Sequence, residues 1–182
     1  MHQSMKPTIH LVIGSTGAGK STYARQLAEK TSGARFAIDE WITALYGEDR
    51  PVDADYHWYR ERIDRATDKI WRVASQLVNL GMDSVLEIGL TQHVEREKFY
   101  QRVREAGVTL RLHVLDAPRE VRWQRVEQRN QHQGETFSME VTRGMFDFVE
   151  EMWEPPKEEE MREWKGQHID SSKPGTSGKT RA

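Results

Sequence analysis

One stretch near the N-terminus, TIHLVIGSTGAGKST at 8–22, constrains the fold and the function of this chain more than any other. An apolar run over 8–13 leads into a glycine-rich turn, and a helical pattern follows at 20–31. The fixed positions of the pattern GxxxxGK[ST] are occupied by Gly14, Gly19, Lys20 and Ser21. This order of strand, loop and helix predicts a loop that binds the phosphates of a nucleoside triphosphate.

Each residue type in this loop meets a physical need of a bound triphosphate. Glycine has no Cβ, so successive backbone N–H groups can turn toward an anion, and the positive end of the helix dipole adds to the attraction. We expect Lys20 to contact the β and γ phosphates, and Ser21 to give its hydroxyl to a magnesium ion that those phosphates bind. The residues predicted to bind the nucleotide are Gly14, Ser15, Thr16, Gly17, Ala18, Gly19, Lys20, Ser21 and Thr22.

Strand and helix patterns alternate along the rest of the chain. Further apolar runs predict strands at 34–39, 83–88, 108–115 and 167–170. Periodic apolar positions predict helices at 56–80, 91–106, 118–131 and around 145–152. In the helix at 91–106 they predict that Val94, Phe99 and Val103 point inward. Such alternation is typical of an α/β fold, here a parallel sheet of about five strands with helices on both faces.

Acidic residues end two of the predicted strands. Asp39 follows one apolar run and Glu87 lies near the end of the next. Ligands of open α/β sheets bind beyond the carboxyl ends of the strands, so Asp39 is a candidate for chemistry and Glu87 for holding magnesium through water. Asp39 could also cap a helix, and Glu87 could anchor a cap or a loop; both alternatives stay open.

The helix predicted at 118–131 carries three arginines on one face: Arg122, Arg125 and Arg129. A polar segment, HQGETFS, follows them. Arginines at the base of a polar flap are typical of a site that stabilises the negative charge developing on a transferred phosphoryl group. The alternative is a solvated basic face paired with Glu120 and Glu127.

The composition bounds the remaining possibilities. The 182 residues are enough for one well-formed core but not for two comfortable domains. A formal net charge of -2 argues against coating nucleic acid by bulk charge. The absence of cysteine excludes disulfides and a cysteine nucleophile, and the scattered histidines argue against a zinc site. No apolar run approaches the ~20 residues that cross a bilayer, so we expect no membrane association and a cytoplasmic protein.

Taken together, four features resemble the AAA-type small P-loop kinases, a group similar to gluconate kinase, chloramphenicol phosphotransferase and the kinase half of polynucleotide kinase. They are GSTGAGKST at 14–22, the acid Asp39, VLEIGL with Arg96 beyond it, and DAPREVRWQRVEQRN at 116–130 with Ser138 beyond it. The resemblance extends to about residue 170. It implies a P-loop NTPase three-layer sandwich, with one kinase-like domain over 1–170 and a helical lid around 119–140. The composition of residues 171–182, which is polar and rich in Ser, Gly and Lys, predicts a disordered tail.

The resemblance also implies roles for individual residues. Asp39 would orient or deprotonate an acceptor hydroxyl, while Arg125 and Arg129 would belong to the lid, one near the adenine and one near the phosphates. The sequence departs from many relatives in two places: it reads DEWI at 39–42 where they have DEIR, and it has Glu87 where they have aspartate.

The leading hypothesis is a kinase that transfers the γ-phosphoryl group of ATP to a hydroxyl of a small molecule, with Mg²⁺. Its predicted catalytic residues are Lys20, Asp39, Arg125 and Arg129, and Arg125 would also bind the nucleotide. One alternative is a 5′-hydroxyl polynucleotide kinase with a channel lined by Tyr56, Trp58, Arg60 and Arg62, which the acidic charge balance disfavours. Another is an ATP-dependent regulatory switch or ATPase. The acceptor and the oligomeric state stay open, and nucleic acid is a possible but less favoured partner.

Overall fold

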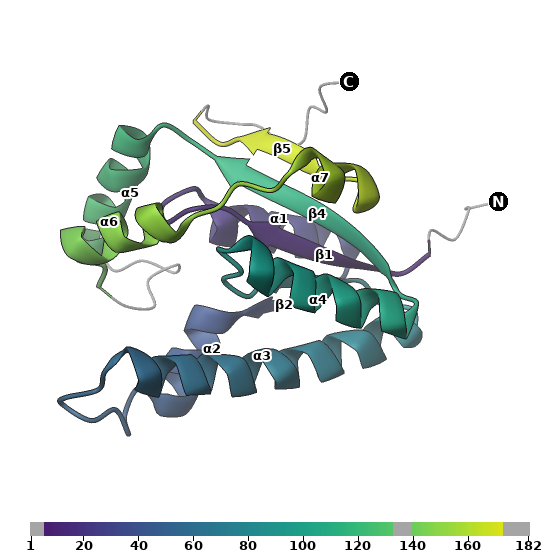
Figure 1. Ribbon diagram of the computed structural model, residues 1–182, viewed down its shortest axis with the longest axis horizontal. Coiled ribbons are helices and arrows are strands. Elements are labelled where there is room, and N and C mark those ends of the chain that lie inside the picture. The colour runs from purple at the N-terminus through teal and green to yellow at the C-terminus, as the bar shows by residue number, and fades with distance from the viewer. Residues whose placement is uncertain (1–5, 133–139, 173–182) are drawn as a thin grey trace.

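The computed structural model describes residues 6–132 and 140–172, and its centre is a five-stranded parallel sheet (Figure 1). The strands are β1 (Thr8–Ile13), β2 (Ala34–Ala37), β3 (Ser84–Glu87), β4 (Thr109–Asp116) and β5 (Gln167–Asp170). Their order in the sheet is β2-β3-β1-β4-β5, and every neighbouring pair is parallel. The predicted fold class is therefore confirmed.

Seven helices accompany the sheet in the described ranges. They are α1 (Lys20–Thr31), α2 (Ile38–Tyr46), α3 (Tyr56–Asn79), α4 (His93–Ala106), α5 (Arg119–His132), α6 (Arg143–Met152) and α7 (Glu158–Glu163). Helices α3 and α4 cover one face of the sheet and α1 covers the other, which gives three layers (Figure 1). None of the helices within residues 6–132 and 140–172 combines the length and the apolar character needed to cross a membrane.

Strand β1 lies at the middle of the sheet, and both of its faces are buried. Ile9, Leu11 and Ile13 point toward the cluster that includes α3 and α4, whereas Val12 packs on the side of α1. All six residues of β1 are buried, as expected for a central parallel strand. The two buried residues of α1 are alanines, Ala24 and Ala28, so this helix can approach the sheet closely.

Three predictions about local structure are wrong. Strand β2 ends at Ala37, so Asp39 is neither a strand end nor a helix cap; it lies in the first turn of α2, where the helix dipole favours an acid. Val94, predicted to point inward from α4, is 55% exposed. The tail was predicted to begin at residue 171, but Ser171 donates a hydrogen bond to the carbonyl of Ala18. Ser138, the flap at 133–139 and residues 173–182 lie outside the described residues.

Candidate nucleotide and acceptor site

The glycines of the phosphate-binding loop occupy backbone conformations that other residues rarely adopt. Gly17 has a φ of 78°, and a Cβ on it would lie 2.4 Å from the carbonyl oxygen of Arg122. Gly14 has a φ of 150°, and a Cβ there would lie 2.3 Å from the carbonyl oxygen of Leu115. Both distances are too short for any side chain. The loop is thus held between the end of β4 and the first turns of α5, which only glycine permits.

Lys20 is the first residue of α1, and its side chain turns back over the loop. Its Nζ donates hydrogen bonds to the carbonyl oxygens of Gly14 and Ser15, at 2.9 and 3.0 Å. Burial lowers the pKa of Lys20, while the carboxylates of Asp39 and Glu87 oppose the shift. The ammonium group is therefore desolvated and held where a phosphate chain would lie across the helix N-terminus.

A cavity of about 770 Å³ opens beyond the carboxyl ends of the strands. Its nucleotide half is lined by the loop and α1 and by residues of α5 and the C-terminal strand: Gly14, Thr16, Gly17, Gly19, Lys20, Ser21, Thr22, Arg125 and Ser171 among them. Two residues predicted to bind the nucleotide are absent from this lining. Ser15 and Ala18 are buried beneath the loop, and the N–H of Ala18 donates to the carbonyl of Ser15.

Asp39 reaches this cavity from α2, where it is exposed, and lies near two cations. Burial lowers the pKa of Lys20 and of Arg129, and the carboxylate of Asp39 opposes the shift in both. Among the described residues, the buried Nε of Arg129 has no hydrogen-bond partner. One carboxylate and two cations thus face the same space between the loop and α2.

Glu87 ends β3, is buried, and also lines the cavity. Its Oε1 accepts a hydrogen bond of 2.8 Å from Arg35 of the neighbouring strand β2, and Arg35 also pairs with Glu40 at 2.8 Å. The bond across the two strands replaces the helix cap considered from the sequence. It holds one oxygen of Glu87 and fixes the direction of the carboxylate.

Arg125 of α5 also lines the nucleotide half of the cavity. Its guanidinium donates to the carbonyl and the hydroxyl of Ser171 at 2.5 and 3.0 Å, and reaches the carbonyl of Gly17 at 3.4 Å. Ser171 in turn donates to Ala18. The residue after β5 therefore packs on the phosphate-binding loop and lines the cavity, a position that its place in a polar, Ser- and Gly-rich tail did not indicate.

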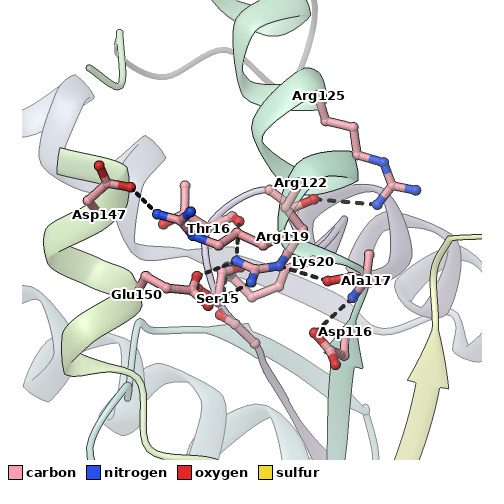
Figure 2. A network of polar contacts seen from close by, with 12 residues as sticks. Ser15, Thr16, Lys20, Asp116, Ala117, Arg119, Arg122, Arg125, Asp147 and Glu150 are labelled. Carbon is pink, nitrogen blue, oxygen red and sulfur yellow. Dashed lines mark hydrogen bonds and ion pairs between the residues drawn. The ribbon is translucent and has the colours of Figure 1, made fainter. Parts of the chain in front are cut away.

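Arg122 does not share the environment of the two other arginines on α5. Its side chain is buried, forms a two-bond pair of 2.6 and 2.7 Å with Glu150 of α6, and donates to the carbonyls of Ala117 and Thr16 (Figure 2). Glu150 also accepts a bond of 3.0 Å from the hydroxyl of Ser15. Arg122 thus ties the phosphate-binding loop to α6, and neither function predicted for it from the sequence is its role.

The acceptor half of the cavity lies on the other side of Asp39. We define it by the lining residues of α2, α3, α6 and the segments after β3 and α6: Asp39, Glu40, Arg60, Ile63, Glu87, Leu90, Met145, Phe148, Val149, Met152 and Trp153. Trp58, predicted to line a polynucleotide channel, is absent from this lining, and so is its neighbour Tyr59. They pack on each other at 5.1 Å, and Arg62 stacks 3.8 Å above Trp58. The side chain of Tyr56 lies outside the described part of the structure.

A row of hydrogen-bonded polar side chains runs beneath α1 from the cavity to Asp83, at the amino end of β3. Tyr23, which lines the cavity, is 2.9 Å from Nδ1 of His113; Nε2 of His113 is 3.0 Å from Nδ1 of His10; and Nε2 of His10 is 3.3 Å from Asp83. Burial lowers the pKa of His113 to about 3, with further contributions from His10 and Arg111. Burial also lowers the pKa of His10, against the effect of Asp83. Both imidazoles are therefore neutral at pH 7.

A family model for an AAA domain matches residues 9–152, which contain the loop, both acids and the arginines of α5. The chain belongs to this family. As a member of the AAA-domain family, it is also similar to a shikimate kinase from Xanthomonas campestris pv. campestris (strain 8004), with 31% identity over 114 residues. The matched segment covers 60% of this chain and 58% of the shikimate kinase, so the alignment spans little more than half of that relative.

Solved structures share the fold of this AAA-domain protein over nearly its whole length. A gluconokinase from Sinorhizobium meliloti 1021 has a TM-score of 0.60 and 20% identity, and the match covers 93% of this chain and 85% of the other. The APS kinase CysC from Mycobacterium tuberculosis, solved with AMPPNP and APS, also has a TM-score of 0.60, with 17% identity over 92% and 90% of the two chains. The resemblance to small P-loop kinases that the sequence predicted is confirmed.

Proposed function

We propose that this protein is a kinase that transfers the γ-phosphoryl group of ATP to a hydroxyl of a small molecule. One observation carries the proposal: the Asp39 carboxylate shares a cavity with the Lys20 ammonium and the Arg129 guanidinium, next to a phosphate-binding loop. A binding module would need the loop and the lysine alone. An acid facing the transfer position gives the cavity a group that can receive the proton of an acceptor.

In this mechanism the loop N–H groups and Lys20 hold the β and γ phosphates, and Lys20 leaves the carbonyls of Gly14 and Ser15 to do so. Asp39 orients the acceptor hydroxyl and takes its proton. The hydroxyl oxygen forms a bond to the γ phosphorus while the bond between the γ phosphorus and the β–γ bridging oxygen breaks. The bridging oxygen keeps the electron pair and leaves as part of ADP. Arg129, with an unengaged Nε in the described residues, offsets the charge on the transferred group.

Magnesium fits the oxygen donors on the two sides of this space. Ser21 follows Lys20 in α1 and lines the cavity, and Glu87 ends β3 with one oxygen held by Arg35. A hydroxyl and a carboxylate are hard oxygen ligands of the kind Mg²⁺ prefers. Ser21 and Glu87 would hold the ion, which when bound neutralises phosphate charge.

The relatives support a small-molecule acceptor. Shikimate kinase and gluconokinase are named for small hydroxyl compounds, and the APS kinase was solved with the ATP analogue AMPPNP. The predicted channel for a polynucleotide has less support: Arg60 pairs with Glu95 and Asp64, and Arg62 stacks on Trp58. Both arginines are thus committed to contacts within the protein.

The variant Asp39→Asn tests the mechanism directly. It keeps the shape of the side chain but removes the proton acceptor, so we expect ATP to bind with unchanged affinity while phosphoryl transfer falls by about 10²–10⁴-fold. Asp53→Asn is the matched control, because it makes the same change at an exposed aspartate that lies outside the cavity lining. Transfer by Asp39→Asn at the wild-type rate would refute the role of Asp39.

A further inference from the structure

The acceptor half of the cavity has an apolar wall that the nucleotide does not use. Helix α6 places Met145, Phe148, Val149 and Met152 at spacings of three and four, so they form one stripe, and all four line the cavity. Its other face carries Phe146, which is fully buried. The stripe therefore faces the cavity and not the core.

This wall leaves large apolar side chains in contact with solvent. Phe148 is 51% exposed and Met145 is 39% exposed. Ile63 of α3, Leu90 and Trp153 continue the apolar lining around the same space. An apolar concave surface of this kind, beside a few polar groups, is typical of a site whose ligand covers it.

The charges on the acceptor side are predominantly negative. Arg60 is held by Glu95 at 2.5 Å and by Asp64 at 3.2 Å, and Arg35 is held by Glu87 and Glu40. The exposed carboxylate of Asp39 adds to this excess of acids. Lys20, Arg125 and Arg129 line the cavity too, but they lie at the phosphate-binding loop and at the transfer position. An anionic acceptor would therefore meet carboxylates without a cation of its own.

We propose that the acceptor is an uncharged alcohol with an apolar body, which packs against the α6 stripe and presents its hydroxyl to Asp39. This inference rests on the proposed function and narrows its substrate class. The hydroxyl oxygen binds the γ phosphorus, ADP leaves and Asp39 receives the proton, so the product is a phosphate monoester of that alcohol. Sugar acids and other carboxylates are poor acceptors, because they bring a second negative charge and little apolar surface.

A matched pair of acceptors separates the effect of the acceptor's charge from the effect of its apolar surface. Phenylethanol and its para-carboxylate differ by one charge, and gluconate and shikimate represent anionic polyols. With γ-labelled ATP, we expect phosphoryl transfer to phenylethanol with a kcat/KM about tenfold or more above that for the carboxylate, and no transfer to gluconate or shikimate above background. Equal or better transfer to any of the anionic acceptors overturns the inference and leaves the kinase proposal standing.

A charged residue introduced into the apolar stripe of α6 tests whether the stripe contacts the acceptor. Phe148→Lys is expected to raise KM for phenylethanol by about tenfold and to lower KM for the carboxylate, while Phe148→Leu keeps the wild-type preference. Leu80→Lys is the control for an added lysine, because Leu80 is 82% exposed and lies outside the cavity lining. Thermal unfolding checks that each variant folds. A preference that Phe148→Lys does not change refutes the assignment of the stripe.

Binding is measured separately from transfer through the fluorescence of Trp153, with Trp153→Phe to isolate its signal. If phenylethanol changes this fluorescence in the presence of a non-hydrolysable ATP analogue but is never phosphorylated, the acceptor pocket stands and the kinase proposal fails. If it neither binds nor reacts while an anionic acceptor is phosphorylated, the kinase proposal stands and the inference fails. If no acceptor binds or reacts, both fail.

Discussion

Replacing Glu150 with alanine is expected to destabilise the fold and to loosen the phosphate-binding loop together. The variant leaves the guanidinium of Arg122, which is 4% exposed, without its carboxylate partner. Removing one member of a buried ion pair costs about 3–5 kcal/mol. Since the Glu150 side chain is 28% exposed and water can reach part of the pair, we expect the lower end of that range.

For a chain of this size, about 3 kcal/mol corresponds to a decrease of about 6–12 °C in Tm. Differential scanning calorimetry or thermal unfolding followed by circular dichroism measures it. Hydrogen bonds from Arg122 lower the pKa of Glu150, partial burial acts in the opposite direction, and the bond from Ser15 supports the lower value. The stabilisation is therefore present above the pKa of the unfolded glutamate and is lost as the pH falls through the lower native value.

Two further variants decide whether the ion pair or the deleted side chain causes the effect. Glu151→Ala removes the neighbouring, exposed glutamate and is expected to change Tm by no more than about 1–2 °C. The double variant Arg122→Met, Glu150→Leu replaces both charges with apolar groups and should recover much of the lost stability. A double variant as unstable as the sum of its two single variants would refute the idea that an uncompensated buried charge is responsible.

Two other predictions concern the loop and the core beneath it. Gly17→Ala is expected to lower ATP affinity by about tenfold or more in a calorimetric titration, because the added Cβ would lie 2.4 Å from the carbonyl of Arg122; unchanged affinity would show that the loop relaxes freely. The pKa of His113 is about 3 in the folded protein and about 6.5 in the unfolded chain. Between these two pH values only the unfolded chain binds the proton. The free energy of unfolding therefore falls by about 1.4 kcal/mol per pH unit as the pH drops below 6.5. His113→Gln removes this titration, so a variant with the wild-type slope between pH 6.5 and 5 in urea unfolding contradicts the assignment.

The local part of the site could be predicted from the sequence because its geometry is set by neighbours in the chain. The loop, its lysine and the strand before it occupy one continuous stretch, and their order was enough to place the phosphates. Asp39 and Glu87 were found through a topological rule, since the carboxyl ends of parallel strands share one edge of the sheet. The error of two residues in β2 did not matter, because Asp39 faces the same cavity from the first turn of α2.

The parts that escaped prediction depend on segments far apart in the chain. Arg122 and Glu150 are 28 positions apart, and periodicity placed Arg122 on a face with Arg125 without showing that its partner comes from α6. Amphipathic spacing revealed the apolar stripe of α6, but not whether it covers the sheet or a cavity. Ser171 lies in a polar stretch whose composition resembles a tail, and only the structure shows its contacts with Ala18 and Arg125 at the cavity.

Helix α6 connects the two halves of the site, because one of its faces lines the acceptor half and another contacts the phosphate-binding loop through its partners. One face presents Phe148 and Met152 to the acceptor half, while Glu150 ties the helix to Arg122 and Ser15 below the phosphate-binding loop. A substitution on the stripe is therefore expected to change which alcohol is accepted and to leave ATP affinity intact. A substitution at Glu150 releases the helix from the loop and should weaken both. If Phe148→Lys lowered ATP affinity as much as Glu150→Ala, this division between the two faces of α6 would be wrong.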